Sequence, residues 1–151
     1  MFSFDVAKKG QVLVNSHRGD CIRCPENTMP AFISAVERNT SCIEIDIAMT
    51  ADEELVVIHD PSVNRTSDGS GYVEQMTLAE LEALDFGGWF HSSFEKTSIP
   101  KFSEVLEWAI EHGVGLIVEA KQRRNHHRFA EKLTVLIAVS YTHLRAHETE
   151  E

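Results

Sequence analysis

The sequence predicts an α/β fold in which helices cover a mainly parallel sheet. Short runs rich in β-branched residues alternate with helical patterns along the chain, and this alternation is typical of βαβ units. With 151 residues, 42% of them hydrophobic, the chain can bury the core of one domain. The order of the elements alone fits an open sheet and a closed barrel equally well.

The first part of the chain predicts three strands and a helix. Residues 12–14 form a β-branched run that leads into a polar loop, as a strand does. Thr28, followed by Pro30, is typical of the start of a helix. In the segment 42–49 three isoleucines alternate with other residues, and this period of two predicts a strand. A short polar turn separates it from a strand at 55–59, which favours an antiparallel hairpin.

The second part of the chain predicts a loop-rich insertion and three further elements. The insertion covers about residues 60–100, and Thr77 with Glu80 forms a capping box for a short helix inside it. An apolar stripe over residues 102–110 predicts a helix that ends at Gly113. Two elements follow, a strand at 116–120 and a helix at 129–139.

Acidic side chains share one face on two of the predicted strands. Glu44 and Asp46 are two residues apart, so both point to one side of the sheet, roughly 7 Å apart along the backbone. Glu119 and Lys121 likewise share a face of the last strand. A solvated antiparallel strand produces the same pattern without any function. If the two strands are parallel neighbours under helices, however, three carboxylates converge, and oxygen ligands of this kind suit Mg²⁺ or Ca²⁺.

Two histidines follow predicted strands, and each precedes a charged residue. His17 comes before Arg18, and His59 comes before Asp60. A histidine in such a place is most often structural, but imidazole titrates near neutral pH, so a pair can supply a general base and a general acid. Arg18 and Lys121 offer positive charge to a phosphate diester whose transition state gains negative charge. Together with the acidic cluster, these residues predict phosphoryl transfer.

Five short motifs occur in a fixed order over about residues 12–121. They are His17-Arg18-Gly19, Pro25-Glu26-Asn27-Thr28, Glu44-x-Asp46, His59-Asp60 and Glu119-x-Lys121. This ordered set resembles the signature of the glycerophosphodiester phosphodiesterases. The resemblance implies a TIM-type (β/α) barrel that hydrolyses glycerophosphodiesters to an alcohol and glycerol 3-phosphate, a reaction of lipid and glycerol metabolism.

The resemblance also implies roles for the acidic residues and the histidines. Glu44, Asp46 and Glu119 would be the ligands of one divalent cation, Mg²⁺ or Ca²⁺. His17 and His59 would be the catalytic acid–base pair. In this family the glycerol hydroxyl beside the phosphate is thought to attack first, and water then opens the cyclic phosphate.

The other motif residues would bind the substrate or support the site. By the same resemblance, Arg18 and Lys121 would bind the phosphate. Glu26 and Asn27 would lie near the mouth of the barrel, Glu26 close to the metal and Asn27 organising the loop. Asp60 would be a further supporting residue of the site.

The length of the chain is short for such a barrel, which usually needs around 250 residues. We therefore expect residues 1–139 to be the N-terminal half to two-thirds of a truncated barrel domain. The pattern fades after Lys121, and we expect residues 140–151 to be a non-native tail from a truncated or mis-joined reading frame. A partial barrel exposes sheet edges and apolar surface, which predicts self-association or loss of activity.

Composition narrows the possible partners and location. A net charge of −10, from 24 acidic and 14 basic residues, argues against a general nucleic-acid binder. No apolar run approaches the roughly 20 residues of a transmembrane helix, and residues 1–10 lack the order of a secretory signal. We expect a cytoplasmic enzyme whose partner is a small-molecule glycerophosphodiester.

Three alternatives stay open. Cys21-x-x-Cys24 could bind zinc or form a redox-sensitive disulfide, although two loop cysteines without function are the simpler interpretation. A phospholipase of the sphingomyelinase D type shares two histidines and an acidic metal site. An inactive fragment that only binds ligand would keep the same residues.

Overall fold

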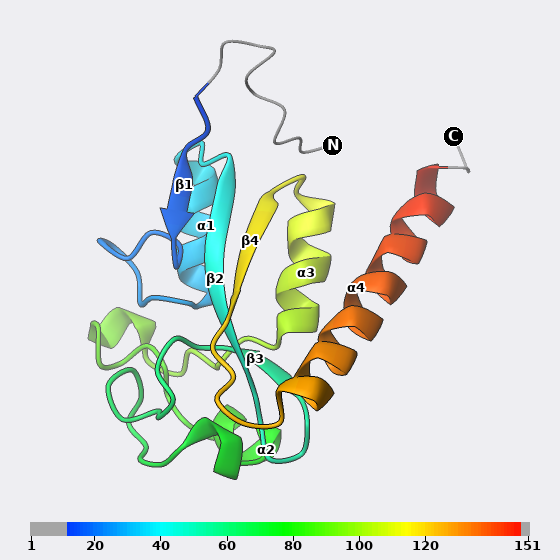
Figure 1. The fold of residues 1–151 in the computed structure, drawn as a ribbon. Helices are drawn as coiled ribbons and strands as arrows, with labels where there is room; N and C mark the ends of the chain where they lie inside the picture. Colours follow the sequence, from blue (N-terminus) through cyan, green and yellow to red (C-terminus); the bar gives the residue numbers. More distant parts are fainter. Residues whose placement is uncertain (1–11, 149–151) are drawn as a thin grey trace.

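The computed structural model describes residues 12–148, and the side chains of residues 12–140. A four-stranded sheet lies in the middle of the fold, with helices against one of its faces (Figure 1). The strands are β1 (Asn15–His17), β2 (Cys42–Met49), β3 (Leu55–Val57) and β4 (Gly115–Ala120). The helices are α1 (Met29–Glu37), α2 (Leu78–Glu82), α3 (Phe102–Glu111) and α4 (His126–Glu148), and two short 3₁₀ helices are η1 (Val73–Gln75) and η2 (Ser92–Phe94).

Strand β2 is the centre of the sheet and contacts all three other strands. It pairs in parallel with β1 and with β4, and antiparallel with β3. Ile47 pairs with both Val57 of β3 and Ala120 of β4, so these two strands lie on opposite edges of β2. The parallel neighbours β1, β2 and β4 are linked through α1 and α3, which is the βαβ arrangement that the sequence predicts.

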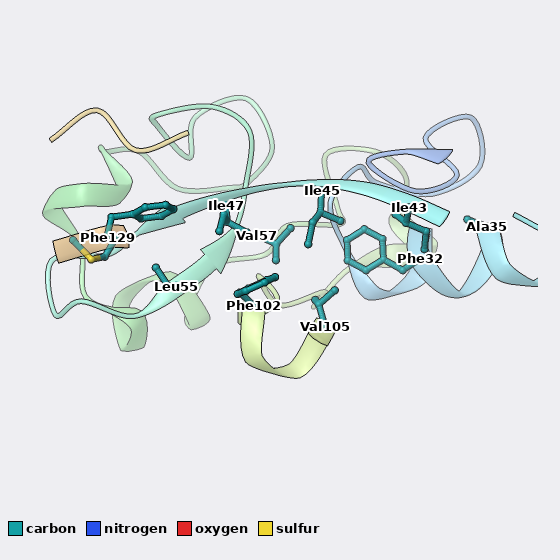
Figure 2. Close-up of a cluster of buried hydrophobic side chains, with 11 residues drawn as sticks. Phe32, Ala35, Ile43, Ile45, Ile47, Leu55, Val57, Phe102, Val105 and Phe129 are labelled. Carbon is teal, nitrogen blue, oxygen red and sulfur yellow. The ribbon is translucent and has the colours of Figure 1, made fainter. Parts of the chain in front are cut away.

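The main core lies between β2 and the helices. Ile43, Ile45 and Ile47 point to the helical side of the sheet and are fully buried. Figure 2 shows them in a row, facing Phe32 of α1 and Phe102 of α3. Each buried isoleucine contributes about 1.5–3 kcal/mol relative to an exposed one. Because side chains alternate along a strand, this packing turns Glu44 and Asp46 to the opposite face.

A second core holds the insertion between β3 and α3. It consists of buried side chains from β2, β3 and the insertion itself: Ala48, Val56, Ile58, Val63, Val73, Leu81, Phe86 and Ile99. The capping box predicted for Thr77 and Glu80 is present, with each residue's side chain accepting a hydrogen bond from the other's backbone N–H. The insertion is therefore packed against the sheet beside the end of β3.

The structure confirms most of the predicted elements and moves two of them. The first strand is wrong by three residues: it covers Asn15–His17 rather than 12–14, because pairing with β2 begins at Asn15, while Val12 and Val14 are exposed. The last helix begins at His126 and extends to Glu148, beyond the predicted range 129–139. The non-native origin of residues 140–151 stays a prediction. Among the described residues, no helix is both long and apolar enough to span a membrane.

Candidate active site

The predicted site residues gather toward the carboxyl ends of the parallel strands. Strands β1, β2 and β4 run in parallel, so their carboxyl ends meet there, and the register places His17 opposite Glu44 and Asp46 opposite Glu119. The antiparallel hairpin turns β3 back along β2, and the backbone N–H of Ile58 donates to the carbonyl of Asp46. His59 therefore follows β3 beside the middle of β2.

Three carboxylates converge at this end of the sheet. Glu44, Asp46 and Glu119 each offer an oxygen, and these oxygens lie within 4.8 Å of one another. Asp46 is fully buried, Glu44 is 8% exposed, and the side chain of Glu119 is 55% exposed. Burial, with the charge of Asp46 adding to it, raises the pKa of Glu44 above its ordinary value. Close carboxylates on a buried strand are costly unless cations neutralise them.

Two carboxylate oxygens in this cluster suit a hard cation. Glu44 Oε2 and Asp46 Oδ1 are buried, and neither has a hydrogen-bond donor within the described residues. Asp46 Oδ1 lies 3.3 Å from Lys121 Nζ, an ion-pair distance without hydrogen-bond geometry. Oxygen-only ligands at this spacing are the type that Mg²⁺ and Ca²⁺ prefer.

Arg18 and Lys121 flank the carboxylates. Arg18 Nε lies 3.1 Å from Asp46 Oδ2, and its Nη1 donates to Glu26 Oε1 at 3.0 Å. Lys121 Nζ donates to Glu119 Oε1 at 2.5 Å. This hydrogen bond raises the pKa of Lys121 and lowers the pKa of Glu119, so both side chains are charged at neutral pH. Arg18 and Lys121 thus both lie at the acidic cluster, and their role in binding phosphate stays a prediction.

The two histidines differ in their surroundings. His59 Nδ1 lies 2.7 Å from Asp60 Oδ1, and its side chain is 31% exposed. A carboxylate partner at Nδ1 favours the tautomer with the proton on that atom, which leaves Nε2 as the free basic nitrogen. His17 is more exposed, and its Nε2 lies 3.8 Å from Glu44 Oε2. Each ring thus has a carboxylate neighbour, which is Asp60 for His59 and Glu44 of the acidic cluster for His17.

The loop after β1 holds Arg18 in place through unusual backbone angles. Arg18, Gly19 and Asn27 all have positive φ values, of 57°, 87° and 54°. The side-chain amide of Asn27 donates to Asp46 Oδ2 at 2.9 Å, and its backbone N–H donates to the carbonyl of Arg18 at 3.0 Å. Asn27 therefore ties the loop to Asp46, the metal-ligand candidate.

Arg65 is a further site residue that the sequence analysis missed. Glu26 lies between Arg18 and Arg65, and its place near the metal stays a prediction. Arg65 also contacts Asp60, with Nε 2.7 Å from Oδ2. One signal was available: Arg65 is the only lysine or arginine between Arg38 and Lys96. A lone cation in a long acidic stretch is a candidate partner for buried carboxylates.

The cysteines of the C-x-x-C segment are both free thiols. Cys21 and Cys24 form no disulfide, and Cys21 Sγ donates to the backbone oxygen of His17 at 3.2 Å. Burial raises the pKa of Cys21 to about 11, so the reactive thiolate is scarce at neutral pH. Within the described residues the one group of potential metal ligands contains no cysteine.

A cavity of about 320 Å³ lies beside Lys121. Its lining includes Pro61 and Tyr72 from the insertion and Arg124 from the segment after β4. Arg124 forms an ion pair with Glu74, another lining residue. The cavity thus adjoins the acidic cluster through the Lys121 side chain.

Many known proteins are similar to this chain. A glycerophosphodiester phosphodiesterase of Caldanaerobacter subterraneus subsp. tengcongensis is 45% identical over 97 residues, which cover 64% of this chain and 40% of that protein. The crystal structure of a glycerophosphodiester phosphodiesterase from Agrobacterium tumefaciens str. C58 has a TM-score of 0.75 at 32% identity, covering 83% of this chain and 54% of the other. An Oleispira antarctica phosphodiesterase in complex with its product sn-glycerol-3-phosphate has a TM-score of 0.81 at 29% identity, covering 87% and 54%.

The chain therefore spans about half the length of these proteins, or less. Similarity to the solved structures, together with the parallel sheet, indicates a TIM-barrel-type fold of which this chain holds part. The sequence model of the glycerophosphoryl diester phosphodiesterase family matches residues 17–147, past Lys121, where the motif pattern ends. By this match over most of its length, the chain belongs to the glycerophosphoryl diester phosphodiesterase family.

Proposed function

We propose that the chain carries the catalytic residues for the hydrolysis of glycerophosphodiesters to an alcohol and glycerol 3-phosphate. The observation that carries this proposal is the convergence of Glu44, Asp46 and Glu119 within 4.8 Å, with Arg18 and Lys121 beside them. The similar Oleispira antarctica enzyme, which holds sn-glycerol-3-phosphate as its product, supports the choice of substrate class.

The three carboxylates would hold one divalent cation, Mg²⁺ or Ca²⁺. The bound cation would orient the glycerol hydroxyl and screen negative charge on the phosphate. The site holds five carboxylates and three cationic side chains. The carboxylates are those of Glu26, Glu44, Asp46, Asp60 and Glu119, and the cations are Arg18, Arg65 and Lys121. With neutral histidines the net charge is −2, which a single divalent cation balances.

The histidines would move the protons of the reaction. One histidine takes the proton from the attacking glycerol hydroxyl, and the other histidine gives a proton to the oxygen of the leaving alcohol. At His59 the atom for this transfer is Nε2, because Nδ1 is held by Asp60. Arg18 and Lys121 would bind the phosphate oxygens, where positive charge stabilises the transition state. The leaving alcohol would occupy the cavity beside Lys121.

The experiment is to measure glycerol 3-phosphate release from glycerophosphocholine by the chain, with Mg²⁺ or Ca²⁺ added. We expect turnover that chelation of the cation abolishes, and that His59→Ala lowers by about 10²–10⁴-fold, the usual contribution of general acid–base catalysis. His112→Ala is the matched control, because His112 lies between the end of α3 and the amino end of β4, and it contacts Trp108.

One alternative has a specific observation in its favour. The chain spans about half the length of its relatives, so a fragment that binds ligand without turning it over is the second candidate. A well-folded chain that binds glycerol 3-phosphate but releases none from glycerophosphocholine would favour that candidate. Cleavage of sphingomyelin without cleavage of glycerophosphocholine would favour the sphingomyelinase D type instead.

A further inference from the structure

Arg65 joins two loops that come from different strands. Its Nη1 and Nη2 donate to the two carboxylate oxygens of Glu26 at 2.9 and 2.8 Å. Its Nε and Nη2 donate to the two oxygens of Asp60 at 2.7 and 3.1 Å. The guanidinium is planar and presents its donors in a rigid fork, so one arginine can bind two carboxylates side by side in this way.

Each of these carboxylates binds a site residue as its second partner. Glu26 Oε1 accepts from Arg18 Nη1 at 3.0 Å, and Asp60 Oδ1 lies 2.7 Å from His59 Nδ1. Arg65 is therefore the middle of a continuous chain of contacts that begins at Arg18 and ends at His59. All three nitrogens of the Arg65 guanidinium are engaged by Glu26 and Asp60, which leaves its main donors committed within the protein.

The charges along this chain alternate in sign. Hydrogen bonds from Arg65 lower the pKa of Glu26 and of Asp60 below their ordinary values, so both stay ionised acceptors. An ionised Asp60 fixed by Arg65 can accept a hydrogen bond from only a limited set of directions, and His59 Nδ1 occupies one of them. The ring is then held with Nε2 free, which is the geometry that a proton-transfer histidine needs.

We propose that Arg65 is a positioning residue of this site: it orients His59 through Asp60 and Arg18 through Glu26, without touching the substrate. The consequence for reaction rate rests on the proposed function, but the effect on the His59 ring does not. A lysine at this position carries the same charge on a single ammonium group, so it can reach one of the two carboxylates and only partly replaces the fork.

The test is the state of the His59 ring, read by NMR from long-range correlations between its carbon-bound protons and ring nitrogens. The 151-residue chain is measured at pH 8, above the ordinary imidazole pKa of about 6.5. His59→Ala identifies the signals. In the wild type we expect the tautomer protonated at Nδ1. Arg65→Met is expected to give a mixture of tautomers, and Arg65→Lys an intermediate result.

Arg128→Met is the matched control for this experiment. The Arg128 side chain is 45% exposed, as is that of Arg65, and it also binds two carboxylates, those of Glu53 and Glu131. It lies on α4, so its loss is expected to leave the His59 signals unchanged. Unchanged His59 signals in both Arg65 variants would overturn the proposal, as would an equal disturbance in Arg128→Met.

Kinetics give a second readout that a purely structural role would not produce. We expect Arg65→Met to lower kcat/KM by about 10–100-fold, the usual cost of losing a residue that orients a functional histidine, with partial recovery in Arg65→Lys. Combining Arg65→Met with Asp60→Asn should cost little more than the larger single change, because the two act as a unit. Full additivity would contradict the proposal. Absence of turnover in the wild type would count against the proposed function alone, and the NMR result would still decide the role of Arg65.

Discussion

Gly19 controls the position of Arg18 through its backbone. Its φ of 87° is in the left-handed region, and a Cβ added there would lie 2.7 Å from Ala31 Cβ and 2.8 Å from the Ala31 carbonyl carbon. Such contacts in a Gly19→Ala variant would force the loop after β1 and helix α1 apart. Glycine is therefore required here for two separate reasons, its conformation and its size.

The two reasons can be separated with a second glycine. Gly113 has a φ of 65°, and a Cβ there would meet nothing within 4 Å. We expect Gly113→Ala to cost about 1–2 kcal/mol from conformation alone. Gly19→Ala is expected to cost about 1–3 kcal/mol more, because overpacking is added. Urea unfolding of both variants measures the difference, and equal free energies of unfolding would contradict this explanation.

The carboxylates bound by Arg65 make stability depend on pH. Hydrogen bonds from Arg65 lower the pKa of Asp60 and of Glu26 in the folded state. A carboxyl with a lowered folded pKa stabilises the fold above its unfolded pKa, about 3.9 for Asp and 4.3 for Glu, and this contribution is lost as the pH falls through the folded pKa.

Arg65→Met removes that contribution. We expect the variant to be less stable than the wild type by about 1 kcal/mol at pH 7, the scale of exposed ion pairs. The difference should begin to shrink as the pH falls below about 4, because the unfolded carboxyls then bind protons that the folded wild-type carboxyls, with their lowered pKa, do not. Thermal unfolding followed by circular dichroism from pH 7 to pH 3 tests this. A difference that stays constant over the whole range would be incompatible with the mechanism.

The facing of a side chain could be predicted from the sequence where it lies on a strand with a clear two-residue alternation. Glu44 and Asp46 could be placed on one face because three buried isoleucines occupy the other. Arg65 could not be placed, because its partners Glu26 and Asp60 are 39 and 5 residues away and all three lie in loops. Loop residues have no periodicity, so their partners depend on how the strands pair.

At the scale of elements, the capping box at the start of α2 holds the insertion in shape. Thr77 Oγ1 accepts from the Glu80 N–H, and the Thr77 N–H donates to Glu80 Oε2. Leu81 of the same short helix is fully buried in the second core. A helix of five residues has little stability of its own, so its start depends on these side chains.

Thr77→Ala is expected to lower the free energy of unfolding by about 1 kcal/mol, the usual cost of losing an N-cap. Thr134→Ala is the control, since Thr134 lies inside α4 and its hydroxyl donates to the backbone oxygen of Ala130. There alanine is the better helix former, so the change should be neutral or stabilising. Chemical denaturation distinguishes the two. Equal losses in both variants would argue against a specific role for the cap.

Elements with a strong pattern were predicted well, and elements set by tertiary pairing were not. The range of β2 and the end of α3 before Gly113 follow directly from periodicity and the helix stop. The position of β1 does not, because the β-branched run at 12–14 precedes the residues that pair with β2. Pairing register, rather than propensity, decides where a short strand begins.

At the scale of the whole molecule, the sheet and the last helix leave apolar side chains exposed. Within the described residues, β4 pairs only with β2, and Ile117 on β4 is 40% exposed. Val135, Ile137 and Val139 of α4 are also exposed. The order of elements alone could not separate an open sheet from a barrel. Similarity to longer solved proteins, of which this chain spans about half, indicates the barrel type.

The most direct test of the site is the binding of a divalent cation, measured by isothermal titration calorimetry with Ca²⁺ and with Mg²⁺. We predict one site per wild-type chain and its loss in Glu119→Gln, a change at an exposed ligand candidate that should not disturb the fold. Glu111→Gln, at the exposed end of α3, should bind as the wild type does. A wild type that binds neither cation, or a Glu119→Gln variant that binds with unchanged affinity, would contradict the assignment of these carboxylates.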